Sequence, residues 1–273
     1  TMASGLMLFQ VASIVALVGM GLGWRGVMTK YSGFYDLTTA WGMMFWGILI
    51  GGLYGNLGDQ YLLIPRYSGS VPSILNLIIC LLLAVTVHLV LRRKKIRFGG
   101  SQPTTGWALG LAVGGMVGMF AIYRTLEINE INFSIVGSVV LLAIVTPRSH
   151  ALIFCNHGYR MLQGQRWKAV IHTFVWCCLI ITSVYEALFN PFIWIFVIPV
   201  LLLAEKKSHD WVWAAVPKQA RRRLRRIWAD AARDKFKDHK YYQDTIDFCE
   251  KYDQCSFDPE YKSMSLEDFT PLI

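Results

Sequence analysis

Apolar residues dominate seven stretches of the chain, and polar or basic residues gather between them. The stretches cover approximately residues 6–23, 37–55, 72–91, 106–123, 132–147, 169–189 and 191–204. An α-helix needs about 20 apolar residues to cross the hydrocarbon core of a bilayer, and most of the stretches approach that length. The pattern predicts an all-α polytopic transmembrane bundle of about seven spans. Two alternatives stay open: residues 191–204 form a re-entrant segment, or one marginal span lies flat on the membrane.

The direction of the bundle is predicted from its basic residues. The third stretch is followed directly by Arg92-Arg93-Lys94-Lys95-Ile96-Arg97, and a dense Lys/Arg cluster at the end of a span marks the cytoplasmic side. Loops 24–36, 92–105 and 148–168 and the tail after residue 205 are basic, whereas the intervening loops hold only Arg66 and Arg124. Every second connection is therefore basic. This predicts that the N-terminus is outside and the C-terminus is cytoplasmic.

Composition agrees with a membrane location. Of the 273 residues, 54% are hydrophobic and only 16% are charged, whereas soluble domains carry about 25% charged residues. We predict an integral membrane protein of the plasma or inner membrane or of an internal membrane. The net charge of +9 is interpreted as orienting loop and tail charge, and we do not expect nucleic-acid binding.

Small residues recur at helical spacing in two of the predicted spans. Glycines four residues apart occupy positions 47, 51 and 55 of the second span and 106, 110, 114 and 118 of the fourth. Residues four apart share one helix face, and glycine lets two helix backbones approach closely in lipid. We predict that these spans contact each other or a partner subunit, and we favour packing within one bundle.

Candidate functional residues lie near the predicted outer ends of the spans. They are Asp59, Arg66, Arg124, Glu127, Glu130 and Glu186. We predict that Asp59, Arg66, Arg124 and Glu186 bind substrate in a polar vestibule, and we interpret Glu127 and Glu130 as solvated loop residues. Because Glu186 lies within an apolar stretch, its charge needs a partner. We expect Arg66 or Arg124 to supply it.

Histidine and cysteine supply no convincing metal site. His88 and His172 lie near the predicted inner ends of two spans, and no other ligands accompany them at a suitable spacing. We favour hydrogen-bonded histidines over a haem ligand, a metal ligand or a proton relay. Cys249 and Cys255, near His239, lack the second ligand pair of a zinc site. We predict no metal and no cofactor.

Residues 51–60 read Gly-Gly-Leu-Tyr-Gly-Asn-Leu-Gly-Asp-Gln. This segment locally resembles the Gly-Asn-Leu-x-Asp-Arg segment of lipoprotein signal peptidases. The resemblance implies an aspartic peptidase, whose mechanism needs a second carboxylate facing the first. The next span carries Asn76-Leu77-Ile78-Ile79, with an isoleucine where that aspartate is expected, and Gln60 replaces the arginine. We therefore do not predict this activity.

A tail of different composition follows the predicted bundle of residues 1–205. Within the tail, 206–273, we predict a basic amphipathic helix at 217–237 that lies on the anionic cytoplasmic leaflet. Its membrane-surface residues are Arg221, Arg222, Arg223, Arg225, Arg226 and Trp228. Residues 238–273 carry nine acidic residues against three lysines, together with several aromatic residues. This acidic end is predicted to fold back on the basic helix or to bind a partner.

Two functional hypotheses from different classes follow. The first is a permease-like, channel-like or complex-forming membrane subunit with a polar vestibule on the extracytoplasmic side. The second is a membrane-embedded enzyme that acts on a lipid or lipid-linked substrate at the outer face. The scarcity of intramembrane carboxylates disfavours an ion-coupled transporter, and the missing nucleophile–base pair disfavours the enzyme. We favour the subunit and leave open whether the chain is an enzyme.

Overall fold

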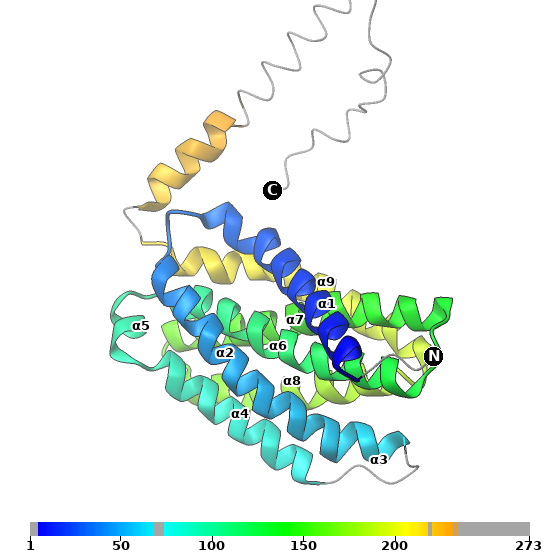
Figure 1. Cartoon of the computed structure of the whole chain (residues 1–273). Helices are drawn as coiled ribbons and strands as arrows, with labels where there is room; N and C mark the ends of the chain where they lie inside the picture. Colours follow the sequence, from blue (N-terminus) through cyan, green and yellow to red (C-terminus); the bar gives the residue numbers. More distant parts are fainter. Residues whose placement is uncertain (1–4, 68–73, 218–219, 232, 234–273) are drawn as a thin grey trace, which may run out of the picture. The chain divides into compact units, whose positions relative to one another are not determined.

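The computed structural model describes residues 5–67, 74–217, 220–231 and 233, and all regular secondary structure in them is helical (Figure 1). The long helices are α1 (Gly5–Val27), α2 (Leu37–Gly58), α4 (Leu75–Leu91), α6 (Gln102–Ile128), α7 (Phe133–Leu162), α8 (Arg166–Glu186) and α9 (Trp194–Ala215). Shorter elements are η1 (Met28–Tyr31), η2 (Asp59–Leu63), α3 (Ile64–Tyr67), α5 (Lys94–Phe98) and η3 (Pro191–Ile193). The chain divides into two units, Thr1–Val216 and Pro217–Ile273.

In the described part of the chain, five helical segments are long and apolar enough to cross a membrane. They are Gly5–Tyr31, Leu37–Arg66, Gln102–Ile128, Phe133–Leu162 and Arg166–Glu186. Helix α4 is also apolar but has only 17 residues, and α9 is not among the five. The long apolar helices agree with the predicted all-α membrane class. The count of seven spans and their direction stay predictions.

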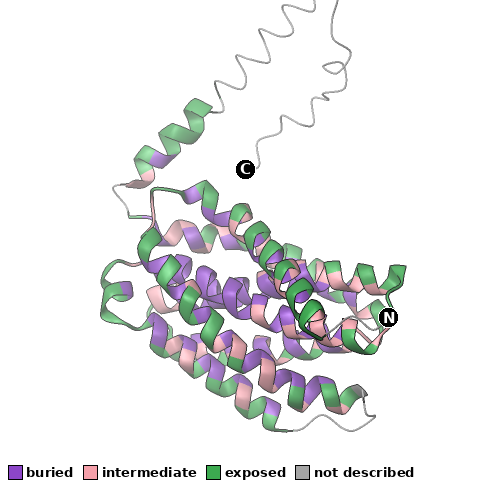
Figure 2. Cartoon of the chain, in the orientation of Figure 1, coloured by how far each residue is buried: buried purple, intermediate pink, exposed green. Residues whose placement is uncertain are grey.

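Helices α6 and α7 form the centre of the first unit, and the other long helices surround them (Figure 2). Most residues of α6 from Gln102 to Ile122 are buried. The surrounding helices turn large apolar side chains outward, for example Phe45 on α2 and Leu82 on α4, which are 62% and 61% exposed. An apolar surface of this kind is expected where lipid, not water, covers the protein.

Glycine makes the contact between α6 and α7 unusually close. A methyl group built at Gly106 would lie 2.3 Å from the carbonyl oxygen of Phe154, and one built at Gly114 would lie 2.4 Å from that of Thr146. Gly110 faces His150 in the same way. As the residue number increases along α6, the number of the contacted residue in α7 decreases, so the two helices are antiparallel. The two backbones touch directly, and any side chain at these glycine positions would push the helices apart.

The glycines of α2 also pack against α6. Methyl groups at Gly47 and Gly51 would approach the backbone of Leu109 and Val113 to 2.7 and 2.6 Å. The predicted contact between these two spans is therefore confirmed. The structure adds that α6 uses its own glycine face for α7 and a different face for α2. Both glycine faces are filled by helices of the same chain, and the partner-subunit alternative stays untested.

Helix α7 continues well beyond the predicted end of the fifth span. The sequence predicted a loop at 148–168, but the chain stays helical to Leu162 and turns only at 163–165. Pro147 has no N–H to donate, so the helix cannot satisfy the carbonyl of Ala143 at that turn. Gly19 of α1 packs directly on this carbonyl. The helix nevertheless continues through the proline, and the prediction of a loop was wrong.

Side chains cap the helices that follow loops. The carboxylate of Asp36 accepts a hydrogen bond from the Thr39 backbone N–H at 3.0 Å and begins α2. The hydrogen bonds from Thr39 lower the pKa of Asp36. Asn132 begins α7 through a 2.9 Å hydrogen bond from the Ile135 N–H. Both residues satisfy backbone donors that a helix leaves free at its first turn.

The predicted boundary after residue 205 falls inside α9. This helix continues through Glu205, which pairs with Arg148 of α7 at 3.5 Å, and the first unit ends at Val216. In the second unit, residues 220–231 are helical. They include the predicted membrane-surface residues Arg221, Arg222, Arg223, Arg225, Arg226 and Trp228. The acidic end at 238–273 lies outside the described residues.

Candidate functional site

The charged candidates gather at one end of the first unit, where α2 changes its winding. After Gly58 the chain makes a π-helical turn over Asp59–Leu63 before it continues as α3. A π-turn inserts a residue into the helix, rotates the side chains that follow, and is frequent at functional sites. Here the turn begins at Asp59, whose side chain lies against α6.

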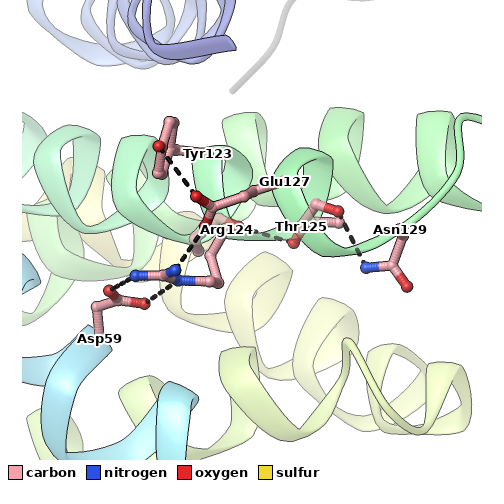
Figure 3. Close-up of polar contacts among 7 residues, drawn as sticks. Asp59, Tyr123, Arg124, Thr125, Glu127 and Asn129 are labelled. Carbon is pink, nitrogen blue, oxygen red and sulfur yellow. Dashed lines mark hydrogen bonds and ion pairs between the residues drawn. The ribbon is translucent and has the colours of Figure 1, made fainter. Parts of the chain in front are cut away.

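Asp59 forms a two-point ion pair with Arg124 near the end of α6 (Figure 3). Arg124 Nη2 donates to Asp59 Oδ2 at 2.6 Å, and its Nε donates to Oδ1 at 3.1 Å. The side chains of Asp59 and Arg124 are only 6% and 22% exposed. A planar guanidinium that meets a carboxylate through two bonds is the strongest ion-pair geometry in proteins. This pair therefore joins α2 to α6.

Glu127 forms a second ion pair with Arg124. It accepts a hydrogen bond from Arg124 Nη1 and another from the hydroxyl of Tyr123, at 3.2 Å (Figure 3). Glu127 is exposed, as a solvated residue would be, but it does not lie in a loop, because α6 extends to Ile128 and brings this residue onto the face of Arg124. The i, i+3 spacing of the two residues was the available signal.

Glu186, at the end of α8, has the partner that its position requires. Arg66 Nε lies 3.0 Å from Oε1 and 3.2 Å from Oε2 of Glu186. Of the two arginines expected as the counter-charge, Arg66 pairs with Glu186, and Arg124 pairs with Asp59. The Arg66 and Glu186 side chains are 42% and 32% exposed, and the guanidinium stands 4.8 Å from the ring centre of Phe189. This second pair is more accessible than the first.

Tyr185 lies beside the residue that precedes Asp59 and is itself followed by Glu186. Its hydroxyl would lie 3.0 Å from a methyl group at Gly58, the residue before Asp59, and Glu186 is the next residue in α8. The ring is buried, and its hydroxyl has no hydrogen-bond partner in the described structure. The four predicted residues Asp59, Arg66, Arg124 and Glu186 thus meet at one end of the bundle. Each carboxylate pairs with its own arginine.

A buried histidine chain lies elsewhere in the first unit and was missed in the sequence. The Nε2 atom of His157 in α7 lies 3.2 Å from the Nδ1 atom of His88 in α4. The Nδ1 atom of His157 lies 2.7 Å from Thr173 Oγ1 in α8. The sequence drew attention to His88 and His172 instead, because His157 falls in the predicted loop 148–168. Among the described residues, no group of three or more His, Cys, Asp or Glu side chains is arranged to hold a metal ion.

Comparison with protein-family models, curated proteins and solved structures found no match for this chain.

Proposed function

We propose that the chain is a permease-like membrane subunit with a charged vestibule formed by Asp59, Arg66, Arg124 and Glu186. The observation that carries this proposal is the contrast between the two ion pairs. Arg124 is held by Asp59 and Glu127 and is largely shielded, whereas Arg66 and Glu186 are 42% and 32% exposed and meet only through one guanidinium nitrogen. An exposed pair of this kind contributes little stability and can exchange partners at small cost.

The exchange defines a class of solute. A carboxylate or phosphate group of the solute replaces Glu186 as the ion-pair partner of Arg66. The released Glu186 can then form an ion pair with a cationic group of the same solute. The buried pair keeps α2 and α6 in place during this exchange. We therefore propose a small anionic or zwitterionic solute.

The alternative of a membrane-embedded enzyme is less well supported. Two carboxylates that work as acid and base must have different protonation states, which requires different environments or a shared proton. Asp59 and Glu186 instead each accept hydrogen bonds from a separate arginine, Arg124 and Arg66. A complex-forming subunit would use the same charged end to bind a neighbour, and the transport assay separates it from a permease.

Purified protein in liposomes tests the proposal through uptake of radiolabelled glutamate, succinate and inorganic phosphate. We expect uptake of at least one of these probes, and Arg66→Gln should reduce it at least tenfold because the anion loses its counter-charge. Arg66→Lys should retain part of the uptake. Lys30→Gln, which removes an exposed charge outside the vestibule, serves as the control. Uptake that is absent for all three probes, or equal in Arg66→Gln and Lys30→Gln, contradicts the proposed role.

The proposed arrangement has seven spans, formed by α1, α2 with α3, α4, α6, α7, α8 and α9, with the C-terminus in the cytoplasm. Reporter fusions test this direction. A green fluorescent protein fused after Ile273 should fluoresce, and an alkaline phosphatase at the same place should be inactive. Phosphatase fused before Gly5 should be active. Reversal of either reporter means that one predicted span does not cross the membrane.

A further inference from the structure

Basic residues gather where α4 and α7 end and α8 begins. These ends meet because His88 near the end of α4 contacts His157 near the end of α7, and His157 contacts Thr173 near the start of α8. The basic residues are Arg92, Arg160, Arg166 and Lys168. None of the four forms an ion pair with a carboxylate in the part of the chain that the structure describes.

Three of the four cations are close enough to a histidine to influence it. Arg92 and Arg166 act electrostatically on His88, and Arg160 acts on His172. Arg160 donates its Nε–H to the neutral Asn156 Oδ1 at 2.7 Å, so its charge is not compensated there. Like charges that gather without a counter-charge repel one another, and an anion at this place would stabilise the bundle. A metal cation would add to the repulsion.

A hollow in the surface of α8 begins at this basic end. It has a volume of about 350 Å³ and is lined by Lys168, Ile171, His172, Val175 and Trp176. The spacing of these residues places them on one side of the helix. Lys168 lies at the end that carries the other basic residues, and Ile171, Val175 and Trp176 extend away from it along the helix. The hollow itself is therefore apolar, and the basic residues lie beside one end of it.

His172 adds a second feature that a ligand could satisfy. Its Nδ1 atom is buried and has no hydrogen-bond partner in the described structure, and its ring lies 6.0 Å from that of Trp176. A buried polar atom without a partner is costly, so a ligand oxygen that pairs with it would stabilise the protein. The neutral ring can donate one hydrogen bond to an anionic oxygen.

We propose that this end of α8 binds one anionic phospholipid. Arg166 and Lys168 hold the headgroup phosphate, Arg92 and Arg160 contribute to the positive potential, and an acyl chain lies in the hollow against Ile171 and Val175. A free phosphate ion would use the cations but would leave the apolar hollow empty. Basic pockets between membrane helices are a general means of binding anionic headgroups. The inference is independent of the proposed transport function, because it concerns the opposite end of α8.

The test measures binding of short-chain dihexanoyl phosphatidylglycerol to the full chain in mild detergent, by thermal shift and native mass spectrometry. Dihexanoyl phosphatidylcholine and inorganic phosphate are the comparison probes. We expect phosphatidylglycerol to raise the unfolding temperature and phosphatidylcholine not to. The double variant Arg166→Gln/Lys168→Gln should weaken phosphatidylglycerol binding roughly 30-fold, the loss expected for two basic residues at a membrane surface.

Two matched controls separate this site from general attraction. Lys206→Gln/Lys207→Gln removes the same charge from α9 and should leave binding unchanged. Val175→Phe, at a 43% exposed position, should fill the hollow and weaken phosphatidylglycerol binding, whereas Leu179→Phe, at a 51% exposed position one turn further along, should not. Equal stabilisation by both lipids, or equal loss in variants and controls, overturns the proposal. Stabilisation by inorganic phosphate alone assigns the cations to a free anion and also overturns it.

Discussion

Replacing Gly110 with alanine is expected to destabilise the protein, although alanine is the better helix former. A methyl group at Gly110 would lie 2.4 Å from the His150 carbonyl oxygen, 2.6 Å from Ala151 Cα and 2.7 Å from Ala151 N. All three atoms belong to the α7 backbone and cannot rotate away, so α6 and α7 must separate. Overpacking of this kind costs about 1–3 kcal/mol, which exceeds the roughly 1 kcal/mol that helix propensity returns.

The measurement is thermal or denaturant unfolding of the purified protein in mild detergent, with Gly137→Ala and Gly42→Ala as controls. Gly137 lies in α7 and Gly42 in α2, and a methyl group at either position would meet nothing within 4 Å. These controls should be neutral or slightly stabilising, because only the helix-propensity term acts on them. If Gly110→Ala is as stable as Gly137→Ala, the close contact between α6 and α7 is not present.

Replacing Arg124 with methionine is expected to have the second large effect. The Asp59 side chain is only 6% exposed and accepts two hydrogen bonds from Arg124. Methionine keeps much of the length of the side chain but leaves the carboxylate buried without its partner. Removing one partner of a buried ion pair costs about 3–5 kcal/mol. Because Arg124 is itself 22% exposed, we expect a loss near the lower end of that range, measured by unfolding in detergent.

The Arg66–Glu186 pair provides the comparison for this prediction. Its side chains are 42% and 32% exposed, so Arg66→Gln should cost only about 0.2–1 kcal/mol. The double variant Asp59→Asn/Arg124→Met should be more stable than Arg124→Met alone, because it removes the unpaired charge. A double-mutant cycle over Asp59→Asn, Arg124→Met and the double variant gives the coupling free energy of the Asp59–Arg124 pair. An Arg124→Met variant as stable as Arg66→Gln would refute the assignment of Asp59 as a buried, paired carboxylate.

Much of the charged end of the bundle was visible in the sequence, because charged residues are rare near apolar stretches and each needs a compensating partner. The rarity singled out Asp59, Arg66, Arg124 and Glu186, and the need for a counter-charge at Glu186 follows from its apolar neighbours. Which arginine pairs with which acid was not visible. That choice depends on the π-helical turn at Asp59 and on where α6 ends, and neither has a distinctive local pattern.

The histidine chain and the basic end of α8 show the other limit. Pro147 and Arg148 interrupt the apolar pattern of the fifth stretch, so the polar residues after them resembled a loop. The structure shows instead that α7 continues through Pro147 and places the buried His157 in contact with α4 and α8.

Long apolar stretches and glycine spacing were enough to predict most of the helices and the small-residue faces of α2 and α6, because both patterns depend on residues within one or two turns of each other. The partners of each face depended on contacts between residues far apart in the chain. The glycines of α6 fit the carbonyls of α7 only because the two helices run antiparallel in one register. Arg124 meets Asp59 because α2 packs beside α6, 65 residues away in sequence. Local composition limits such pairings, and the packed bundle selects among them.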